Sequence, residues 1–229
     1  MADHGGDSGT SMISLIAHEL SQPLAAARGS VLTLAARSDD PGFEIGDRTL
    51  LLDIVMRNLD QLQSLITSLR VFSEVENGER ALETQSVAVS RLLQEIVDDY
   101  DEERTHRHLE LICPESLVVD VDVTLFRQVL SNLVSNAVKF GPPGSTIQVI
   151  ARAERRDTII SVHDAGPGVP RAQRDRIFDK AVRLDAGKRG FGLGLYIARA
   201  VVRAHGGRIS VDKSPRGGAA FSVAIPRAA

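Results

Sequence analysis

Two runs of apolar residues near the start of the chain repeat at alternating spacings of three and four residues. The first run is Leu20, Leu24, Ala27, Val31 and Leu34, and the second is Leu52, Val55, Leu59, Leu62, Ile66 and Leu69. This period is typical of helices that pack side by side at a shallow angle. The connecting segment, residues 38–47, contains Asp-Pro-Gly, which favours a turn. The sequence therefore predicts a helical hairpin, with helices near residues 10–37 and 46–76.

A hairpin of two helices buries too little apolar surface to be stable by itself. Further apolar residues in its second helix, namely Leu51, Ile54, Leu65 and Phe72, indicate a second face that needs a partner. We therefore expect residues 10–76 to form a homodimer, in which two hairpins build a four-helix bundle.

The rest of the chain mixes helical and strand periods. Helices are expected near 89–105, 123–139 and 193–205, and strands near 108–112, 117–121, 146–153, 157–164, 207–213 and 219–225. The runs at 146–153 and 157–164 alternate between apolar and polar residues, which predicts an antiparallel pair of strands. Helices on one side of a mixed or antiparallel sheet form an α/β sandwich. The expected fold is α+β, with a tail at 1–9, the hairpin at 10–76, a linker at 77–84 and the sandwich at 85–229.

The net charge of −3 is divided unevenly along the chain. Residues 1–76 carry 11 acidic residues and 5 arginines, a net of −6, and the remainder carries 19 acidic and 22 basic residues, a net of +3. This balance excludes a generally basic nucleic-acid-binding protein. The single cysteine, Cys113, excludes an intramolecular disulfide and a multi-cysteine zinc site. Because no apolar stretch approaches about 18 residues, we expect no membrane insertion and a cytoplasmic location.

The first expected helix carries a histidine away from its apolar stripe. His18 lies two residues before Leu20, so helical geometry turns it nearly opposite the stripe and toward water. Glu19 follows directly, Gln22 lies one turn on, and Pro23 removes one backbone hydrogen bond of the helix. An exposed imidazole beside a carboxylate can act as a nucleophile, and the alternative interpretation is an ordinary surface histidine.

Three polar residues share one face of the helix expected near 123–139. Asn132, Asn136 and Lys139 stand at i, i+4 and i+7. Two carboxamides and an ammonium suit a hydrated Mg²⁺ ion and the phosphates that it bridges. A polar face turned toward solvent is the alternative.

The segment after the strand at 157–164 contains Asp164, Gly166 and Gly168. A carboxylate at the floor of a pocket can accept a hydrogen bond from an exocyclic amine such as that of adenine. Glycines let the backbone approach a flat ligand closely, although by themselves they are equally typical of a turn.

A second glycine-rich segment leads directly into a helix. Gly190, Gly192 and Gly194 precede the apolar positions of that helix, which begin at Leu195. Free N–H groups at a helix N-terminus form an anion site, so this segment is a candidate phosphate site.

These motifs, in this order, resemble the catalytic core of bacterial sensor histidine kinases over residues 10–226. HELSQPL resembles the phospho-acceptor box, FSEVENG the end of the second bundle helix, and NLVSNAVKF the asparagine box. DAGPG and GFGLGL resemble the two glycine boxes, and HGGRISV and GGAAFSVAIP the closing strands. The resemblance implies a dimerisation and phosphotransfer hairpin followed by an ATP-binding sandwich of the Bergerat type.

The resemblance also implies a role for each motif residue. His18 would be phosphorylated, with Glu19 as its activating carboxylate; Asn136 would be the principal Mg²⁺ ligand, Asn132 would support the metal and the phosphates, and Lys139 would pair with phosphate. Asp164 would hold the adenine amine with Gly166 and Gly168 beside the base, while Gly190, Gly192, Gly194 and Leu195 would line the phosphates under a lid that carries Lys188 and Arg189.

The chain departs from the family pattern at three places. Gln22 stands where many members have a Thr or Asn that positions water for dephosphorylation of the response regulator. Ala181 replaces the usual second aromatic residue after Phe178, and the lid before Gly190 is short. The departures bear on phosphatase activity and on nucleotide retention rather than on the kinase reaction.

The resemblance implies transfer of a phosphoryl group from ATP, with Mg²⁺, to His18, and then to an aspartate on a separate response regulator. Only about nine residues precede the first expected helix, so we expect the input from a separate sensor protein or from a removed region. Two other hypotheses remain. The chain could be a protein of the same ATP-binding fold with another activity, such as a serine kinase or an ATPase, or a phosphotransfer scaffold without catalysis.

Overall fold

The structure, a computed structural model, describes residues 7–38, 40, 42–77, 82–100, 106–179, 182 and 194–227. Some side chains within the first two helices, including those of His18 and Glu19, lie outside this description. The chain divides into two compact units, one with the helices up to Phe72 and the other beginning at Ser73.

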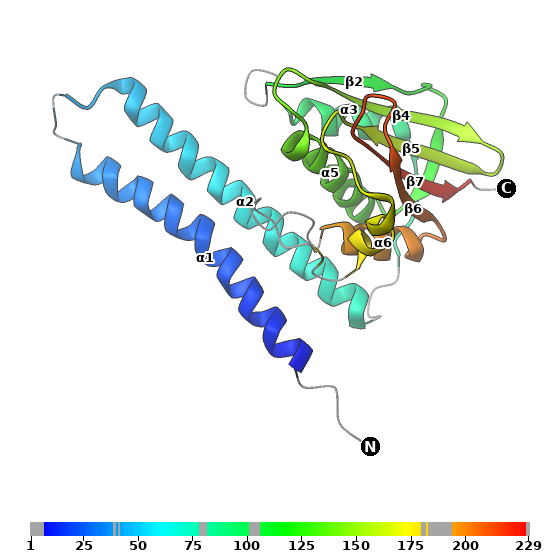
Figure 1. Ribbon diagram of the computed structural model, residues 1–229, viewed down its shortest axis with the longest axis horizontal. Coiled ribbons are helices and arrows are strands. Elements are labelled where there is room, and N and C mark those ends of the chain that lie inside the picture. Colours follow the sequence, from blue (N-terminus) through cyan, green and yellow to red (C-terminus); the bar gives the residue numbers. More distant parts are fainter. Residues whose placement is uncertain are drawn as a thin grey trace. The chain divides into compact units, whose positions relative to one another are not determined.

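The first unit is the predicted helical hairpin. Helix α1 spans Asp7–Ala36 and helix α2 spans Ile45–Asn77, and the two run side by side in opposite directions (Figure 1). Pro23 lies inside α1 and is buried. The helix therefore continues through the proline, although this residue donates no backbone hydrogen bond.

A compact turn joins the two helices. The guanidinium of Arg37 donates to Oδ2 of Asp40 at 2.8 Å, and Oδ1 of the same carboxylate accepts from the backbone N–H of Gly42 at 2.9 Å. These bonds, that from Arg37 first, lower the pKa of Asp40. Phe43 is buried, with the guanidinium carbons of Arg37 and Arg48 at 4.9 and 5.5 Å from its ring centroid. An ion pair and an aromatic anchor thus close the hairpin.

The apolar residues of α2 form two stripes, but not in the predicted division. The half-buried positions are Leu51, Ile54, Val55, Leu62, Leu65 and Leu69. Leu52, Leu59 and Ile66, seven residues apart, are 53%, 46% and 55% exposed. Each residue turns the helix by about 100°, so a spacing of three and four can join positions from neighbouring stripes. The side chain of Phe72, which was predicted to lie on the second face, is outside the described residues.

Among the helices that the structure describes, none is long and apolar enough to cross a bilayer.

The second unit is the predicted α/β sandwich. Its elements are β1 Gln85–Ala88, α3 Val89–Asp98, β2 His108–Ile112, β3 Val118–Val121, α5 Val123–Phe140, β4 Thr146–Glu154, β5 Asp157–His163, η1 Arg171–Gln173, η2 Arg176–Phe178, α6 Gly194–Ala204, β6 Arg208–Lys213 and β7 Ala219–Pro226. Five strands form a sheet in the order β2-β4-β5-β7-β6, in which β2 and β4 are parallel and the other neighbours antiparallel. The predicted pairing of β4 with β5 is therefore confirmed.

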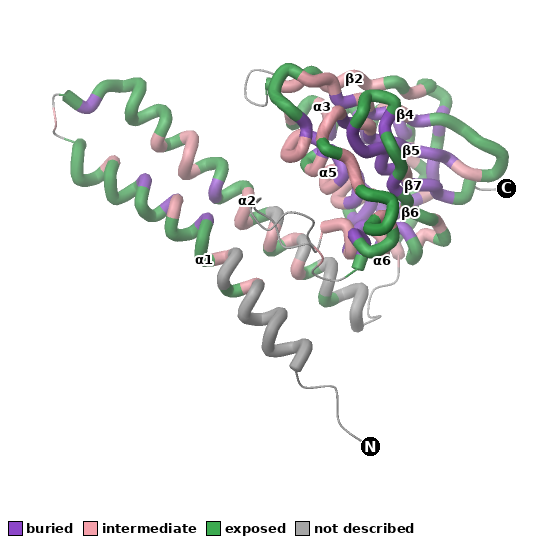
Figure 2. The backbone as a smooth tube through the Cα atoms, viewed as in Figure 1, coloured by how far each residue is buried: buried purple, intermediate pink, exposed green. Residues whose placement is uncertain are grey.

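The core lies between the sheet and its three helices, α3, α5 and α6 (Figures 1 and 2). Alternate residues of β4 are buried there with the apolar stripes of the helices. The central strands β5 and β7 are instead buried at most of their positions. Members of this core include Leu93, Ile96, Phe126, Leu130, Leu133, Ile147, Val149, Ile160, Val162, Ile197, Val201, Val223 and Ile225.

Two details of this unit differ from the prediction. Helix α3 ends at Asp98 rather than near residue 105, because its apolar pattern stops at Val97 and acidic residues follow, which the negative end of a helix disfavours. A short strand that was not predicted, β1, pairs with β3 in a separate two-stranded sheet.

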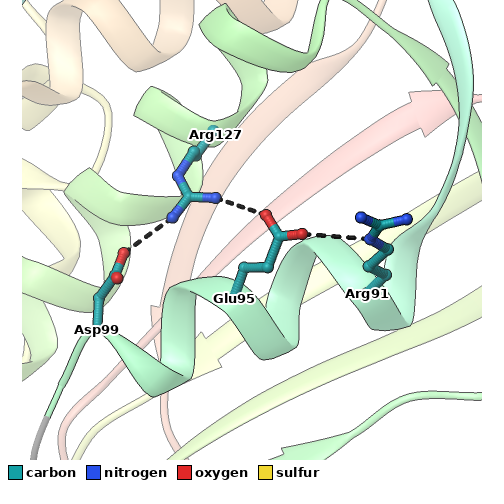
Figure 3. Close-up of polar contacts among 4 residues, drawn as sticks. All are labelled: Arg91, Glu95, Asp99 and Arg127. Atoms are coloured by element: carbon teal, nitrogen blue, oxygen red, sulfur yellow. Dashed lines mark hydrogen bonds and ion pairs between the residues drawn. The ribbon is translucent and has the colours of Figure 1, made fainter.

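A network of ion pairs connects α3 to α5 (Figure 3). Arg127 of α5 contacts Glu95 at 2.7 Å and Asp99 at 2.9 Å, and Glu95 also contacts Arg91 at 3.3 Å. Because all four side chains are partly or largely exposed, the network contributes modestly to stability and mainly fixes where α3 meets α5.

Candidate functional site

Helix α5 carries the predicted metal and phosphate residues. The helix begins with a cap, in which Oδ1 of Asp122 accepts from the backbone N–H of Leu125 at 3.1 Å. Asn132, Asn136 and Lys139 are half-buried on the face that is not packed into the core. Their common face, predicted from the spacing, is present in the structure.

Asn132 connects α5 to α6. Its Nδ2 donates to the carbonyl oxygen of Gly194 at 3.3 Å, and its Oδ1 accepts from Nε2 of Gln128 at 3.4 Å. A Cβ at Gly194 would be in ordinary contact with the Asn132 side chain, 3.5 Å from its Cγ. The asparagine helix and the start of the glycine-box helix are therefore in direct contact.

Asp164 lies directly after β5 and is 3% exposed. Its Oδ1 accepts from the backbone N–H of Gly166 at 2.8 Å and from that of Ala219 at 3.0 Å. The backbone of Asp164 also bonds to residues 218 and 219, at the start of β7. The carboxylate is thus held by the backbone on one oxygen, which orients it without a cation.

Two glycines around this carboxylate are required by space or backbone shape. A Cβ at Gly166 would lie 2.8 Å from the carbonyl oxygen of Phe140, so the glycine lets this loop touch the end of α5. Gly168 has φ +71°, the left-handed region that favours glycine. A Cβ at Gly218 would overlap Oδ1 of Asp164, which makes Gly218 part of the same arrangement.

Two basic groups stand near these residues. Burial, followed by the charges of Arg152 and Arg216, lowers the pKa of His163, whereas Asp164 acts in the opposite direction. The ammonium of Lys139 lies 5.1 Å from the centroid of the Phe140 ring. The imidazole is thus held toward its neutral form, and Lys139 supplies a positive charge at the end of α5.

The structure brings three predicted motifs together around α5. Asn132 touches Gly194, and the loop with Gly166 touches the carbonyl of Phe140. Leu195 is half-buried in the first turn of α6. Lys188, Arg189, Gly190 and Gly192, with Ala181, lie outside the described residues. On α1, Gln22 is exposed, while the side chains of His18 and Glu19 are not described.

Sequence reasoning missed Gly218 and Ala219 as partners of Asp164. Strands β5 and β7 bring these residues together. In their antiparallel register, His163 lies opposite Ala220, which is 57 residues later in the sequence. The Gly-Gly pair before β7 is typical of a turn, and no local pattern indicates that it lies against a carboxylate.

The carboxamide side chains of Asn132 and Asn136 suit a hydrated hard cation more than a metal ion bound entirely by protein ligands. The described residues hold no cluster of three His, Cys, Asp or Glu side chains that would bind a metal ion. Carboxamide oxygens on α5 are neutral ligands, and Mg²⁺ commonly keeps several waters and binds with substrate phosphates. With Asn132 engaged between α5 and α6, Asn136 is the better candidate for the metal.

Comparison with known families defines the class of this protein. Residues 10–78 match the His Kinase A (phospho-acceptor) domain, and residues 121–229 match the family of histidine kinase-, DNA gyrase B- and HSP90-like ATPases. The chain belongs to the sensor histidine kinases and consists of their catalytic core. The expected fold class, a helical hairpin followed by an α/β ATP-binding domain, is confirmed.

Curated relatives support the same assignment. The adaptive-response sensory kinase SasA of Crocosphaera subtropica is 35% identical over 224 residues, which are 94% of this chain and 58% of that protein. SasA of Thermosynechococcus vestitus is 32% identical over 224 residues, 94% of this chain and 59% of that protein. The chain thus spans somewhat less than three fifths of the length of these relatives.

Solved structures share the fold. The histidine kinase AdeS of Acinetobacter baumannii superposes with a TM-score of 0.66 at 20% identity, covering 93% of this chain and 98% of that one. The mycobacterial sensor histidine kinase MprB superposes with a TM-score of 0.57 at 25% identity, covering 64% of this chain and 99% of that one.

Proposed function

We propose that this chain transfers the γ-phosphoryl group of ATP to His18 and then to an aspartate of a separate response regulator. The observation that carries the proposal is the meeting of the asparagine helix, the Asp164 loop and the start of α6 in one unit. This unit follows a helical hairpin whose first helix contains His18 next to Glu19.

The adenine would bind at Asp164. Because Oδ1 already accepts two backbone N–H groups, the carboxylate is oriented before any ligand arrives, and its charge favours an amine donor. Gly166 and Gly168 would lie beside the base. This arrangement supports selection of a purine that carries an exocyclic amine.

The phosphates would extend from α5 toward the start of α6. Asn136, supported by Asn132, would hold Mg²⁺, which neutralises the phosphate charge when it is bound. Lys139 would pair with a phosphate oxygen, and backbone N–H groups of the first turn of α6 would hold the others. The glycines at 190, 192 and 194 with Leu195, and the cations Lys188 and Arg189, belong to this proposed site.

The transfer itself would be performed by the hairpin. A nitrogen lone pair of His18 would attack the γ-phosphorus, the bond from phosphorus to the bridging oxygen would break, and ADP would leave. Glu19 would accept the proton from the second ring nitrogen and thereby raise the nucleophilicity of the first. Gln22, which is exposed on α1 four residues after His18, would bear on a separate reaction, the hydrolysis of the phosphoryl group from the response regulator.

The hairpin would function as a homodimer through residues 10–76. The support is the exposed stripe of Leu52, Leu59 and Ile66 on α2. On α1, Leu24 and Val31, also seven residues apart, are 59% and 49% exposed. A stripe that repeats every seven residues is typical of helices that associate in a bundle. A second copy of the hairpin would cover these side chains.

Labelling with γ-labelled Mg-ATP tests the reaction. We expect a label that survives base, is lost in acid, and is absent from His18→Gln but retained by the control His108→Gln, which changes an exposed histidine of β2. An acid-stable label would contradict the proposal and favour a serine kinase of the same fold. Absence of both label and thermal stabilisation by Mg-ATP would favour a scaffold without catalysis.

A mixture of two inactive variants tests the dimer. His18→Ala lacks the acceptor and Asn136→Ala lacks the proposed metal ligand, so label on the Asn136→Ala chain would demonstrate transfer between subunits. Transfer within one chain gives no label in the mixture, and sedimentation of wild type against Leu59→Glu then measures the dimer directly.

A further inference from the structure

His205, the residue after α6, forms two hydrogen bonds that determine its protonation. Its Nε2 lies 2.9 Å from the backbone nitrogen of Asp122, and its Nδ1 lies 2.8 Å from the carbonyl oxygen of Val201. A backbone N–H only donates and a carbonyl only accepts. The imidazole is therefore neutral, with its proton on Nδ1.

Asp122 joins three segments of the chain. Its Oδ1 caps α5 through Leu125, its Oδ2 accepts from the backbone N–H of Glu83 at 3.4 Å, and its own N–H donates to His205. The residue is 3% exposed. The end of α6, the start of α5 and the segment that leads into β1 therefore meet at one buried residue.

A second hydrogen bond connects α5 and α6. Asn132 donates to Gly194, ten residues along α5 from Asp122 and eleven residues along α6 from His205. The helices thus run in opposite directions, and α6 has one polar connection to α5 at each of its ends. The His205 ring also packs against buried Phe126, with centroids 6.1 Å apart.

We propose that His205 is a positioning residue for the nucleotide site, because its neutral imidazole fixes the end of α6 to the start of α5 and so sets where Gly194 meets Asn132. The proposal rests on the function proposed above. Loss of the Asp122 bond would let α6 shift along α5, which separates the phosphate-binding end of α6 from the metal-binding face of α5. The effect is expected on nucleotide affinity more than on the chemical step.

Two variants of the full chain separate this role from simple packing. His205→Gln places an acceptor oxygen near the position of Nε2, whereas His205→Asn keeps a donor near Nδ1 but is too short to reach the Asp122 N–H. We expect His205→Asn to raise KM for Mg-ATP by about three- to tenfold relative to the wild type, with kcat within about twofold. We expect His205→Gln to keep KM near the wild-type value. A residue that matters only for packing would lower thermal stability and active fraction while KM stayed constant.

Direct binding of a fluorescent ATP analogue, measured on the same variants, makes the outcome independent of phosphorylation. Equal affinity in wild type and His205→Asn, or equal weakening in both variants, would overturn the positioning role. Nucleotide binding without label on His18 would overturn the proposed function alone, whereas no binding by the wild type would overturn both.

Nitrogen-15 spectra of the wild-type chain test the premise even if a variant fails to fold. The expected spectrum has His205 protonated at Nδ1 only at about pH 7. A ring protonated at Nε2, or at both nitrogens, would contradict the hydrogen bond from Asp122 and with it the proposal.

Discussion

The side chain of Asn132 donates a hydrogen bond from Nδ2 to the carbonyl oxygen of Gly194 at 3.3 Å. This bond joins the middle of α5 to the first residue of α6, so two candidate ligand-binding segments share one contact. It also gives the two asparagines of α5 different roles. Asn132 connects the helices, and Asn136, one turn further on, is the candidate metal ligand.

The two asparagines should therefore respond differently to truncation. Asn132→Ala removes a hydrogen bond between helices and is expected to lower the stability of the unliganded protein by about 1 kcal/mol. Asn136→Ala should leave that stability nearly unchanged and abolish the dependence of ATP binding on Mg²⁺. Thermal melts with and without Mg-ATP measure both effects. The same stability loss in both variants would contradict the division of roles.

Asp164→Asn tests the adenine contact while it keeps the size of the side chain. The Oδ1 of asparagine can still accept from Gly166 and Ala219, so the unliganded protein should remain folded. Its Nδ2 would then present a donor to the donor amine of adenine, and ATP affinity should fall at least about tenfold. Titration with a fluorescent ATP analogue measures the loss. Unchanged affinity would show that the amine binds elsewhere.

The element order of this chain could be predicted because its signals are local. The hairpin follows from apolar spacing and one Asp-Pro-Gly turn, and the β4–β5 pair follows from alternation over neighbouring segments. The sequence predicts too long a helix α3 because the polar run after Val97 includes good helix formers. The helix ends earlier because acidic residues are unfavourable at its negative end.

The site was predictable in its residue types but not in its contacts. Asp164 is identified by its motif, yet Gly218 and Ala219 reach it only through the register of β5 on β7. The bond between Asp122 and His205 likewise joins residues 83 positions apart. Such contacts depend on how sheet and helices pack, which spacing within one element does not determine.

Removing Arg127 should produce a small loss of stability that depends on salt. Arg127→Gln breaks contacts to both Glu95 and Asp99, whereas the control Arg91→Gln breaks only the exposed contact to Glu95 (Figure 3). We expect a loss of about 0.5–1 kcal/mol for Arg127→Gln and less for Arg91→Gln, both shrinking in about 1 M salt. Urea unfolding at low and high salt measures this. A loss that is unaffected by salt would assign Arg127 a packing role instead.

Thr158 is a candidate for stabilisation. Its hydroxyl is fully buried in β5 and has no hydrogen-bond partner among the described residues. Thr158→Val replaces this hydroxyl by a methyl group of similar shape, so stability should rise by about 1 kcal/mol. The control, Ser161→Ala, removes a buried hydroxyl that is paired with Ser222 at 2.8 Å and should destabilise. Urea unfolding of both variants decides the comparison, and a loss of stability in Thr158→Val would indicate an unseen partner such as water.

His163 should make the stability of the second unit sensitive to acid. Burial and the charges of Arg152 and Arg216 lower its pKa below the ordinary value of 6.5. As the pH falls through about 6.5, the unfolded chain therefore binds a proton that the folded chain resists, and stability decreases until the folded pKa is passed. His163→Gln should flatten this part of the profile. Arg216→Gln, which removes one neighbouring charge, should flatten it partly.

Urea unfolding between about pH 8 and about pH 5 measures how steeply stability changes with pH in the wild type and in each variant. Since other groups also titrate in this range, the decisive quantity is the difference between wild type and variant, and equal slopes in wild type and His163→Gln would exclude His163 as the cause.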